Sequence, residues 1–206
     1  MISDLVAFTL VGAVLTVTPG LDTLLILQSA LAGTKKQAAF TSLGIVAGLF
    51  VWAALASAGV AAIISASTQL FAAFSVLGAG YLLFLAFGMW RNHTPTAAAT
   101  DLSTTTGLLS SFNKGFLTNL LNPKIGVFYI ALLPNYLTDG VTPIWNGLAL
   151  GLIHATESLL WFAFLILLAN SASSWLTNPT ATSRMNKVFA FIIAGFALSL
   201  LKNLSL

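Results

Sequence analysis

Four ionisable side chains stand inside long apolar stretches of the sequence: Asp22, Lys124, His154 and Glu157. A charge in the middle of an apolar segment costs roughly 2.5–3.5 kcal/mol on insertion scales, and it is normally paired, protonated or water-facing. An acid and an amine at such depth can bind the two charged ends of a zwitterion. They can equally pair with each other and hold two segments together. Both interpretations stay open at this stage.

The acid follows a predicted break in an apolar helix. Asp22 lies just after Thr18-Pro19-Gly20, and a proline inside a helix removes a backbone donor and clashes with the preceding turn. Inside a membrane the freed carbonyls need another helix, a hydroxyl or water. The coincidence of break and charge favours a binding site. The alternative is a simple kink in which Asp22 satisfies the freed backbone locally.

The amine follows a second break of the same kind, in Asn119-Leu120-Leu121-Asn122-Pro123-Lys124. Asn119 and Asn122 are three residues apart and share a helix face. At about 1.5 Å per residue, the predicted depths of Asp22 and Lys124 in the membrane overlap, so a pair between them is geometrically possible. The candidate substrate-binding residues are therefore Thr18, Pro19, Gly20, Asp22, Asn119, Asn122, Pro123 and Lys124.

A further polar face carries His154, Glu157 and Trp161, which are three and four residues apart. An intramembrane glutamate beside a histidine can relay protons, and with Asp22 these two residues are the proton-coupling candidates. The alternative is a static His154–Glu157 hydrogen bond in the bundle interior. The nearby Ser158 lacks the glycine turn of a serine hydrolase, so no enzyme is predicted.

The composition requires a membrane around these residues. The chain has 206 residues, of which 58% are hydrophobic and only 6% charged, whereas soluble domains are about 25% charged. Its net charge of +3 comes from scattered residues and indicates no nucleic-acid partner. With no cysteine and two histidines, neither a metal site nor another cofactor is expected. Without a Walker lysine motif, the chain is not predicted to be an ATP-driven pump.

Windows of about 20 apolar residues predict six transmembrane helices, so the chain is expected to be an all-α membrane protein. They cover roughly 5–32, 38–64, 70–90, 113–137, 144–169 and 186–204, with a linker over 91–112 that is either irregular or a short surface helix. Lys and Arg gather in alternate gaps, which by the positive-inside rule places both termini outside. A five-span variant, in which one weak helix is re-entrant, remains open.

Three short matches recur in the same order and predict two inverted three-helix repeats, approximately 1–90 and 113–206, in one transporter domain over 1–206. They are the two proline breaks, the pairs Gly44-x-x-x-Gly48 and Gly147-x-x-x-Gly151, and the strings Ala79-Gly80-Tyr81 and Ala194-Gly195-Phe196. Inverted repeats of this kind build binding sites near the middle of the membrane. The glycine pairs predict close helix packing and would allow a homodimer. Trp52 and Trp90 are interpreted as anchors at the membrane interface.

The sequence resembles the lysine exporter (LysE/RhtB) family of bacterial amino-acid efflux proteins over nearly its whole length. The most specific match is Phe116-x-x-Asn119-Leu120-x-Asn122-Pro123-Lys124, followed by Phe128-Tyr129 and Leu133-Pro134. Further matches are Gly33-Thr34-Lys35-Lys36 and Gly78-x-Gly80-Tyr81-Leu82 before Arg91. One departure is Leu21, which replaces the second proline of the family's Pro-Gly-Pro segment and puts the geometry of the first break in doubt.

The resemblance implies export of amino acids or related small metabolites from a bacterial cytoplasmic membrane, driven by an ion gradient. Together with the residues, it predicts a secondary transporter in which Asp22 binds the substrate ammonium or a proton. Lys124 binds the substrate carboxylate, or Asp22 in the empty state. Glu157 is the coupling carboxylate in this prediction. An uncoupled small-solute channel and a membrane scaffold subunit without transport activity are the alternatives.

Overall fold

The computed structural model describes residues 2–91, 107–137, 142–171 and 178–203, and every regular element in these ranges is helical. In chain order they are α1 (Ile2–Val17), α2 (Leu21–Ala32), α3 (Lys35–Ala66), α4 (Thr68–Trp90), α5 (Leu108–Leu120), α6 (Pro123–Leu132), the 3-10 turn η1 (Leu133–Tyr136), α7 (Pro143–Leu167) and α9 (Pro179–Asn203). The predicted all-α class is confirmed for this part of the chain.

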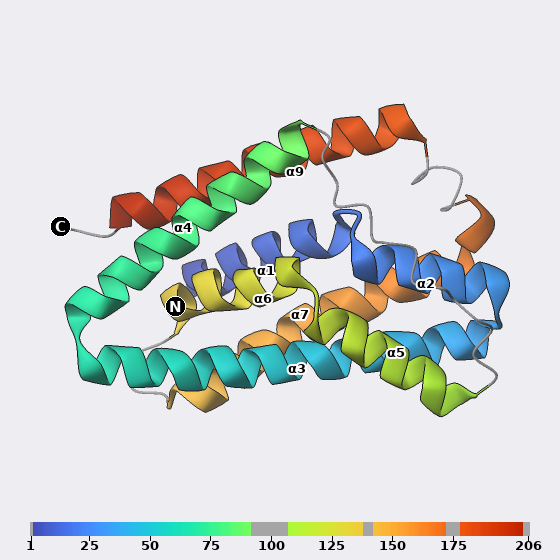
Figure 1. The fold of residues 1–206 in the computed structure, drawn as a ribbon, viewed down its shortest axis with the longest axis horizontal. Helices are drawn as coiled ribbons and strands as arrows, with labels where there is room; N and C mark the ends of the chain where they lie inside the picture. Colours follow the sequence, from blue (N-terminus) through green and yellow to red (C-terminus); the bar gives the residue numbers. More distant parts are fainter. Residues whose placement is uncertain (1, 92–106, 138–141, 172–177, 204–206) are drawn as a thin grey trace.

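The helices form an elongated bundle (Figure 1). When α1–α2 and α5–α6 are each taken as one bent unit, the units run alternately in the two directions along the long axis. α1 begins and α9 ends at the same end of the bundle. α3 packs along α5 and α7, and α4 packs along α9. α1 and α6 lie between these two groups, and their side chains Phe8 and Phe128 join Leu150 of α7 in the main hydrophobic core.

The two predicted breaks are confirmed. α1 and α2 meet at an angle of 51° across the residues around Pro19, and α5 and α6 meet at 54° before Pro123. In each case a proline that cannot donate its backbone nitrogen stands at the break. Asn122 begins the second half-helix as its N-cap, because its side-chain oxygen accepts a hydrogen bond from the backbone nitrogen of Lys124 at 3.1 Å.

Helix starts differ from the prediction in two places. α5 begins at Leu108, inside the predicted linker, and α9 begins at Pro179 rather than at 186. Both helices start with turns that contain serine or threonine, so an apolar window finds only their later, membrane-like part. Most of the predicted linker, residues 92–106, lies outside the described residues.

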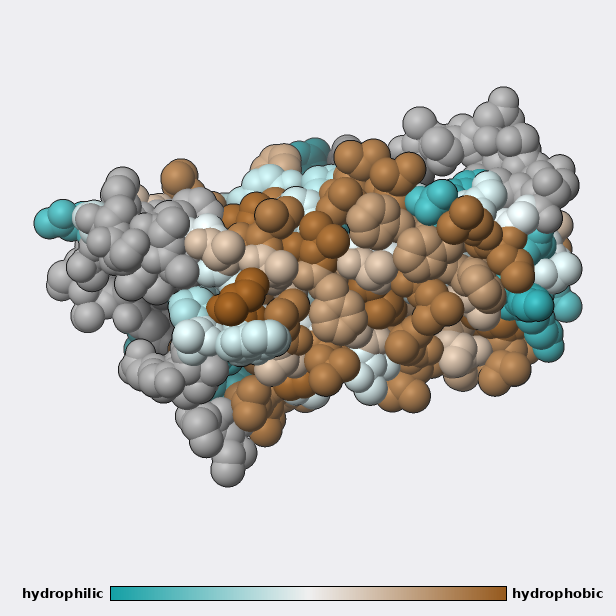
Figure 2. Space-filling model, turned by 90° about the horizontal axis from the view of Figure 1, so that it is seen from below, coloured by the Kyte–Doolittle hydropathy of each residue, from teal (hydrophilic) through white to brown (hydrophobic). Residues whose placement is uncertain are grey.

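The surface suits a membrane. α3 and α7 are long and apolar enough to cross one, and the two bent pairs raise the number of candidate spans to as many as four in the described ranges. Side chains such as Leu55, Leu160 and Phe164 are exposed. Hydrophobic residues cover the middle of the face in Figure 2, with hydrophilic ones toward its ends. The remaining two of the six predicted spans stay predictions.

Close packing at the glycine pairs is confirmed. A Cβ on Gly44 would collide with the Phe112 carbonyl of α5, and one on Gly48 would lie 2.6 Å from Oδ1 of Asn119. The glycine pair of α7 packs against α3 in the same way. Because these faces are used inside the chain, they are not free to pair with a second copy.

Candidate functional site

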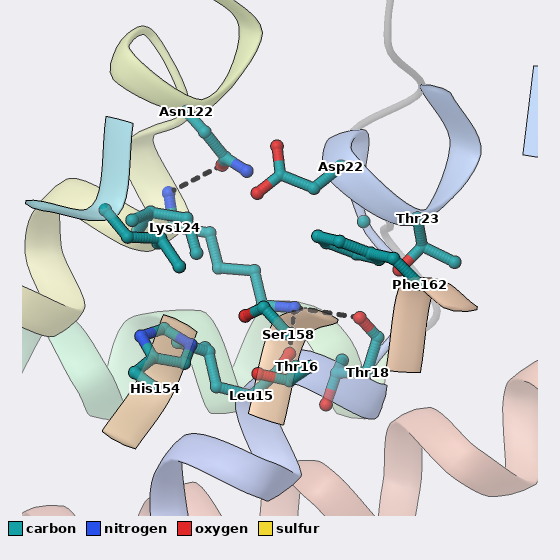
Figure 3. Close-up of a pocket in the computed structure, with 13 residues that line it drawn as sticks. Leu15, Thr16, Thr18, Asp22, Thr23, Asn122, Lys124, His154, Ser158 and Phe162 are labelled. Carbon is teal, nitrogen blue, oxygen red and sulfur yellow. Dashed lines mark hydrogen bonds between the residues drawn. The ribbon is translucent and has the colours of Figure 1, made fainter. Parts of the chain in front are cut away.

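A cavity lies where the two breaks meet (Figure 3). Its walls come from α1, α2, α3, α6 and α7, and its volume of about 20 Å³ has room for about one water molecule. An amino acid therefore cannot enter unless side chains move. The polar residues of the lining are Thr16, Thr18, Asp22, Thr23, Asn122, Lys124, His154 and Ser158.

Asp22 supplies the carboxylate of the site. It lies in the first turn of α2, where the helix dipole favours a negative charge, and its side chain is buried. Its Oδ2 accepts a hydrogen bond of 2.8 Å from the side-chain amide of Asn119. Its Oδ1 is buried and accepts none from the described residues. The amide of Asn122 lies beside the same carboxylate (Figure 3).

Lys124 supplies the ammonium. Its Nζ donates hydrogen bonds of 3.0 Å to the backbone carbonyls of Leu15 and Thr18, at the end of α1. The pair with Asp22 that the sequence left possible is replaced in this structure by separate partners, although both charged groups line one cavity. The reason is that the proline break leaves strong backbone acceptors within reach of the lysine.

Asn119 is fixed from two sides by α3. Its side chain fits over Gly48, and its backbone carbonyl accepts a hydrogen bond of 3.3 Å from Nε1 of Trp52. The interpretation of Trp52 as an interface anchor is therefore wrong, because its ring packs against α6 at Gly126. A tryptophan in the centre of a long apolar helix needs a partner for its N–H, and this was the overlooked signal.

His154 is buried and faces the cavity from α7. Its Nδ1 shares a hydrogen bond of 3.1 Å with the hydroxyl of Tyr129 on α6, and its ring packs against Phe128. The alternative interpretation, a static hydrogen bond between His154 and Glu157, is wrong, because neither oxygen of Glu157 accepts a hydrogen bond from the described residues. The spacing along α7 could not show that the hydrogen-bond partner of His154 lies on the facing helix α6.

Glu157 points at α1 rather than into the cavity. A Cβ on Gly12 would lie 2.6 Å from its Oε2, so the carboxyl group rests on the bare backbone of that glycine. Within the described part of the chain, Oγ1 of Thr16 and Nε1 of Trp161 are likewise buried without hydrogen-bond partners. Thr16 also lines the cavity. The seam between α1 and α7 thus holds unsatisfied polar groups next to the site.

The predicted site residues divide into three groups. Six of them line the cavity: Thr18, Gly20, Asp22, Asn122, Lys124 and His154. Asn119 does not line the cavity but donates a hydrogen bond to Asp22, whereas Pro19 and Pro123 stand at the two helix breaks. Glu157 lies outside the lining.

Sequence reasoning missed part of the lining: Leu15, Thr16, Thr23, Leu49, Ile125, Ser158 and Phe162. The described residues contain no group of three or more His, Asp or Glu side chains that could hold a metal ion.

The sequence matches the family model of the LysE type translocator over residues 13–204, a range that includes both helix breaks. The chain belongs to the LysE family. It is 27% identical over 203 residues to the membrane protein YrhP of Bacillus subtilis (strain 168), covering 95% of this chain and 97% of that protein.

Two further relatives carry names that describe transport. The threonine efflux protein of Escherichia coli (strain K12) is 32% identical over 158 residues, covering 74% of this LysE family chain and 75% of the relative. The homoserine/homoserine lactone efflux protein of Salmonella typhi is 26% identical over 198 residues, covering 94% of each. No solved structure matches the chain.

Proposed function

We propose that this protein is a secondary transporter that exports amino acids or related zwitterionic metabolites across the bacterial cytoplasmic membrane, coupled to the proton gradient. One observation carries the proposal: a carboxylate and an ammonium, each at a helix break, line the same buried cavity. Opposite charges separated inside an apolar bundle are costly unless a ligand of complementary charge uses them. The named relatives, which export threonine or homoserine, support the same solute class.

The fold in this proposal is six spans arranged as two inverted three-helix repeats with both termini outside. The nearly equal bends of α1–α2 and α5–α6 support it, and so does their packing. α3 packs against α5 and α6 as α7 packs against α1 and α2, while α4 and α9 pack on each other. α3, α5 and α9 begin at the same end of the bundle, and their basic residues Lys35, Lys114 and Arg184 favour that end as cytoplasmic (Figure 1).

Transport would proceed by rocking of one repeat against the other around the cavity. Asp22 attracts the substrate ammonium, Lys124 attracts the carboxylate, and the half-helix ends supply backbone groups. The cavity in this structure has room for only about one water molecule, which favours a carrier over a permanently open channel. Glu157 is the coupling carboxylate in this proposal, because neither of its buried oxygens has a hydrogen-bond partner among the described residues and a proton would relieve that cost.

The test is counterflow in proteoliposomes against all common amino acids. Export-competent protein exchanges labelled threonine or homoserine, and Asp22→Asn abolishes exchange because the charged acceptor is lost. Asp4→Asn is the matched control, since Asp4 is exposed at the start of α1. Wild-type protein that exchanges no amino acid would refute the proposal in favour of a scaffold. Flux that is uncoupled and independent of trans substrate would favour a channel.

Coupling is tested separately. Glu157→Gln removes the titrating group but keeps its size, so exchange should continue while accumulation driven by a pH gradient is lost. Unchanged accumulation removes Glu157 from the coupling mechanism without affecting the substrate assignment.

A further inference from the structure

The carbonyls of Leu15 and Thr18 are acceptors that the helix itself cannot satisfy. A helical carbonyl normally bonds to the backbone nitrogen four residues later, which for Leu15 is Pro19, a residue without an N–H. α1 ends at Val17, so Thr18 is also beyond the regular helix. Both oxygens lie at the negative end of the α1 dipole, and together they form a small cation-binding pair.

The side chain of Lys124, on α6, binds this pair of carbonyls. Its ammonium donates to both carbonyls at 3.0 Å, and a Cβ on Gly20 would lie 3.4 Å from Nζ and 3.7 Å from Cδ. The lysine stem thus lies over Gly20 and occupies the room between the breaks. This explains why a site with so many polar groups has space for only about one water molecule.

We propose that the Leu15 and Thr18 carbonyls are the subsite for the primary ammonium group of the transported solute, and that Lys124 occupies it in the resting carrier as a tethered substitute. The inference rests on the proposed function and deepens it. A solute ammonium displaces the lysine, is shared between the two carbonyls and Oδ1 of Asp22, which accepts no hydrogen bond from the described residues, and leaves Lys124 to bind the solute carboxylate.

The exchange leaves each ammonium group with hydrogen-bond acceptors before and after binding. Before binding, the ammonium of Lys124 donates to the carbonyls of Leu15 and Thr18. A bound zwitterion adds one ammonium and one carboxylate, and Lys124 then moves from the two carbonyls to the solute carboxylate. A simple amine would displace Lys124 without offering it a carboxylate. The subsite therefore selects solutes that carry a primary ammonium and a carboxylate together, and disfavours N-acylated amino acids.

Lys124→Ala tests the subsite, because it removes the tether and opens its space. Ethylammonium replaces the lost end of the side chain, so it should raise the melting temperature of purified Lys124→Ala by about 3–6 °C at tenfold its dissociation constant. Wild-type protein should show no such shift, since its own lysine fills the subsite. Tetramethylammonium has the same charge but no N–H, and should not stabilise the variant.

Three results would overturn the inference: equal stabilisation of wild type and variant by ethylammonium, equal stabilisation by tetramethylammonium or sodium, or no stabilisation of the variant. If Lys124→Ala does not fold, Lys124→Cys serves instead, because the chain has no other cysteine. Alkylation with 2-bromoethylamine rebuilds a lysine-like ammonium and should restore the wild-type melting temperature and exchange. Alkylation with iodoacetamide, which adds a neutral group, should restore neither, and equal recovery with both reagents would overturn the subsite.

The inference and the proposed function fail separately. Amino-acid counterflow by wild type together with no ethylammonium effect refutes only the subsite. An ethylammonium effect without any amino-acid counterflow refutes the transport proposal, and with it the assignment of the subsite to a transported solute.

Discussion

Gly48→Ala should disable the site although Gly48 does not line it. The added methyl would lie 2.6 Å from Oδ1 and 3.0 Å from Cβ of Asn119, closer than side chains pack. Asn119 is held by its own helix and must turn away, which breaks its 2.8 Å hydrogen bond to Asp22. A hydrogen bond to a charged group contributes about 1.5–3 kcal/mol.

Since about 1.4 kcal/mol corresponds to a factor of ten, the loss should reduce kcat/KM for exchange about 10- to 100-fold. The assay is initial-rate counterflow in proteoliposomes with equal amounts of inserted protein. Gly59→Ala is the matched control, because it lies on the same helix and its new methyl would meet nothing within 4 Å. The control should exchange like wild type.

A double variant separates the proposed contact from general overpacking. In an Asn119→Ala background the amide is already lost, and of the three nearest atoms to the new methyl of residue 48 only the Cβ remains, so Gly48→Ala should add little further loss. Fully additive losses would show that the methyl acts elsewhere. Wild-type exchange by Gly48→Ala itself would refute the positioning of Asp22 by Asn119.

Three further variants probe the surroundings of the site. Trp52→Phe loses one neutral hydrogen bond to α5, about 1 kcal/mol, and should lower the melting temperature in detergent by roughly 2–4 °C; an unchanged value contradicts the contact. Tyr129→Phe leaves His154 without its partner and should slow exchange about tenfold at about 1.4 kcal/mol, whereas full activity would make that bond dispensable. Gly12→Ala crowds Glu157 and should impair gradient-driven accumulation more than counterflow, and equal impairment of both would argue against a coupling role.

The family, the helix breaks and the charges beside them were predictable from the sequence, because they depend on residues close together in the chain. Composition alone requires a membrane, and the proline breaks follow from the missing N–H of Pro19 and Pro123. The resemblance to the lysine exporter family is confirmed by a match over residues 13–204. The presence of an acid and an amine beside the breaks was equally readable, since a charge in an apolar segment stands out.

The tertiary structure decided which hydrogen-bond partners the polar residues of the site have. Asn119 and Asp22 are 97 residues apart, and they meet only because Gly48 lets α5 approach α3 closely. Lys124 has a long flexible side chain that can reach several acceptors, and packing placed the freed carbonyls of α1 nearest to its ammonium. Helical periodicity fixes which face a residue occupies but not which helix lies opposite, so the separate hydrogen bonds of acid and amine could be found only in the folded bundle.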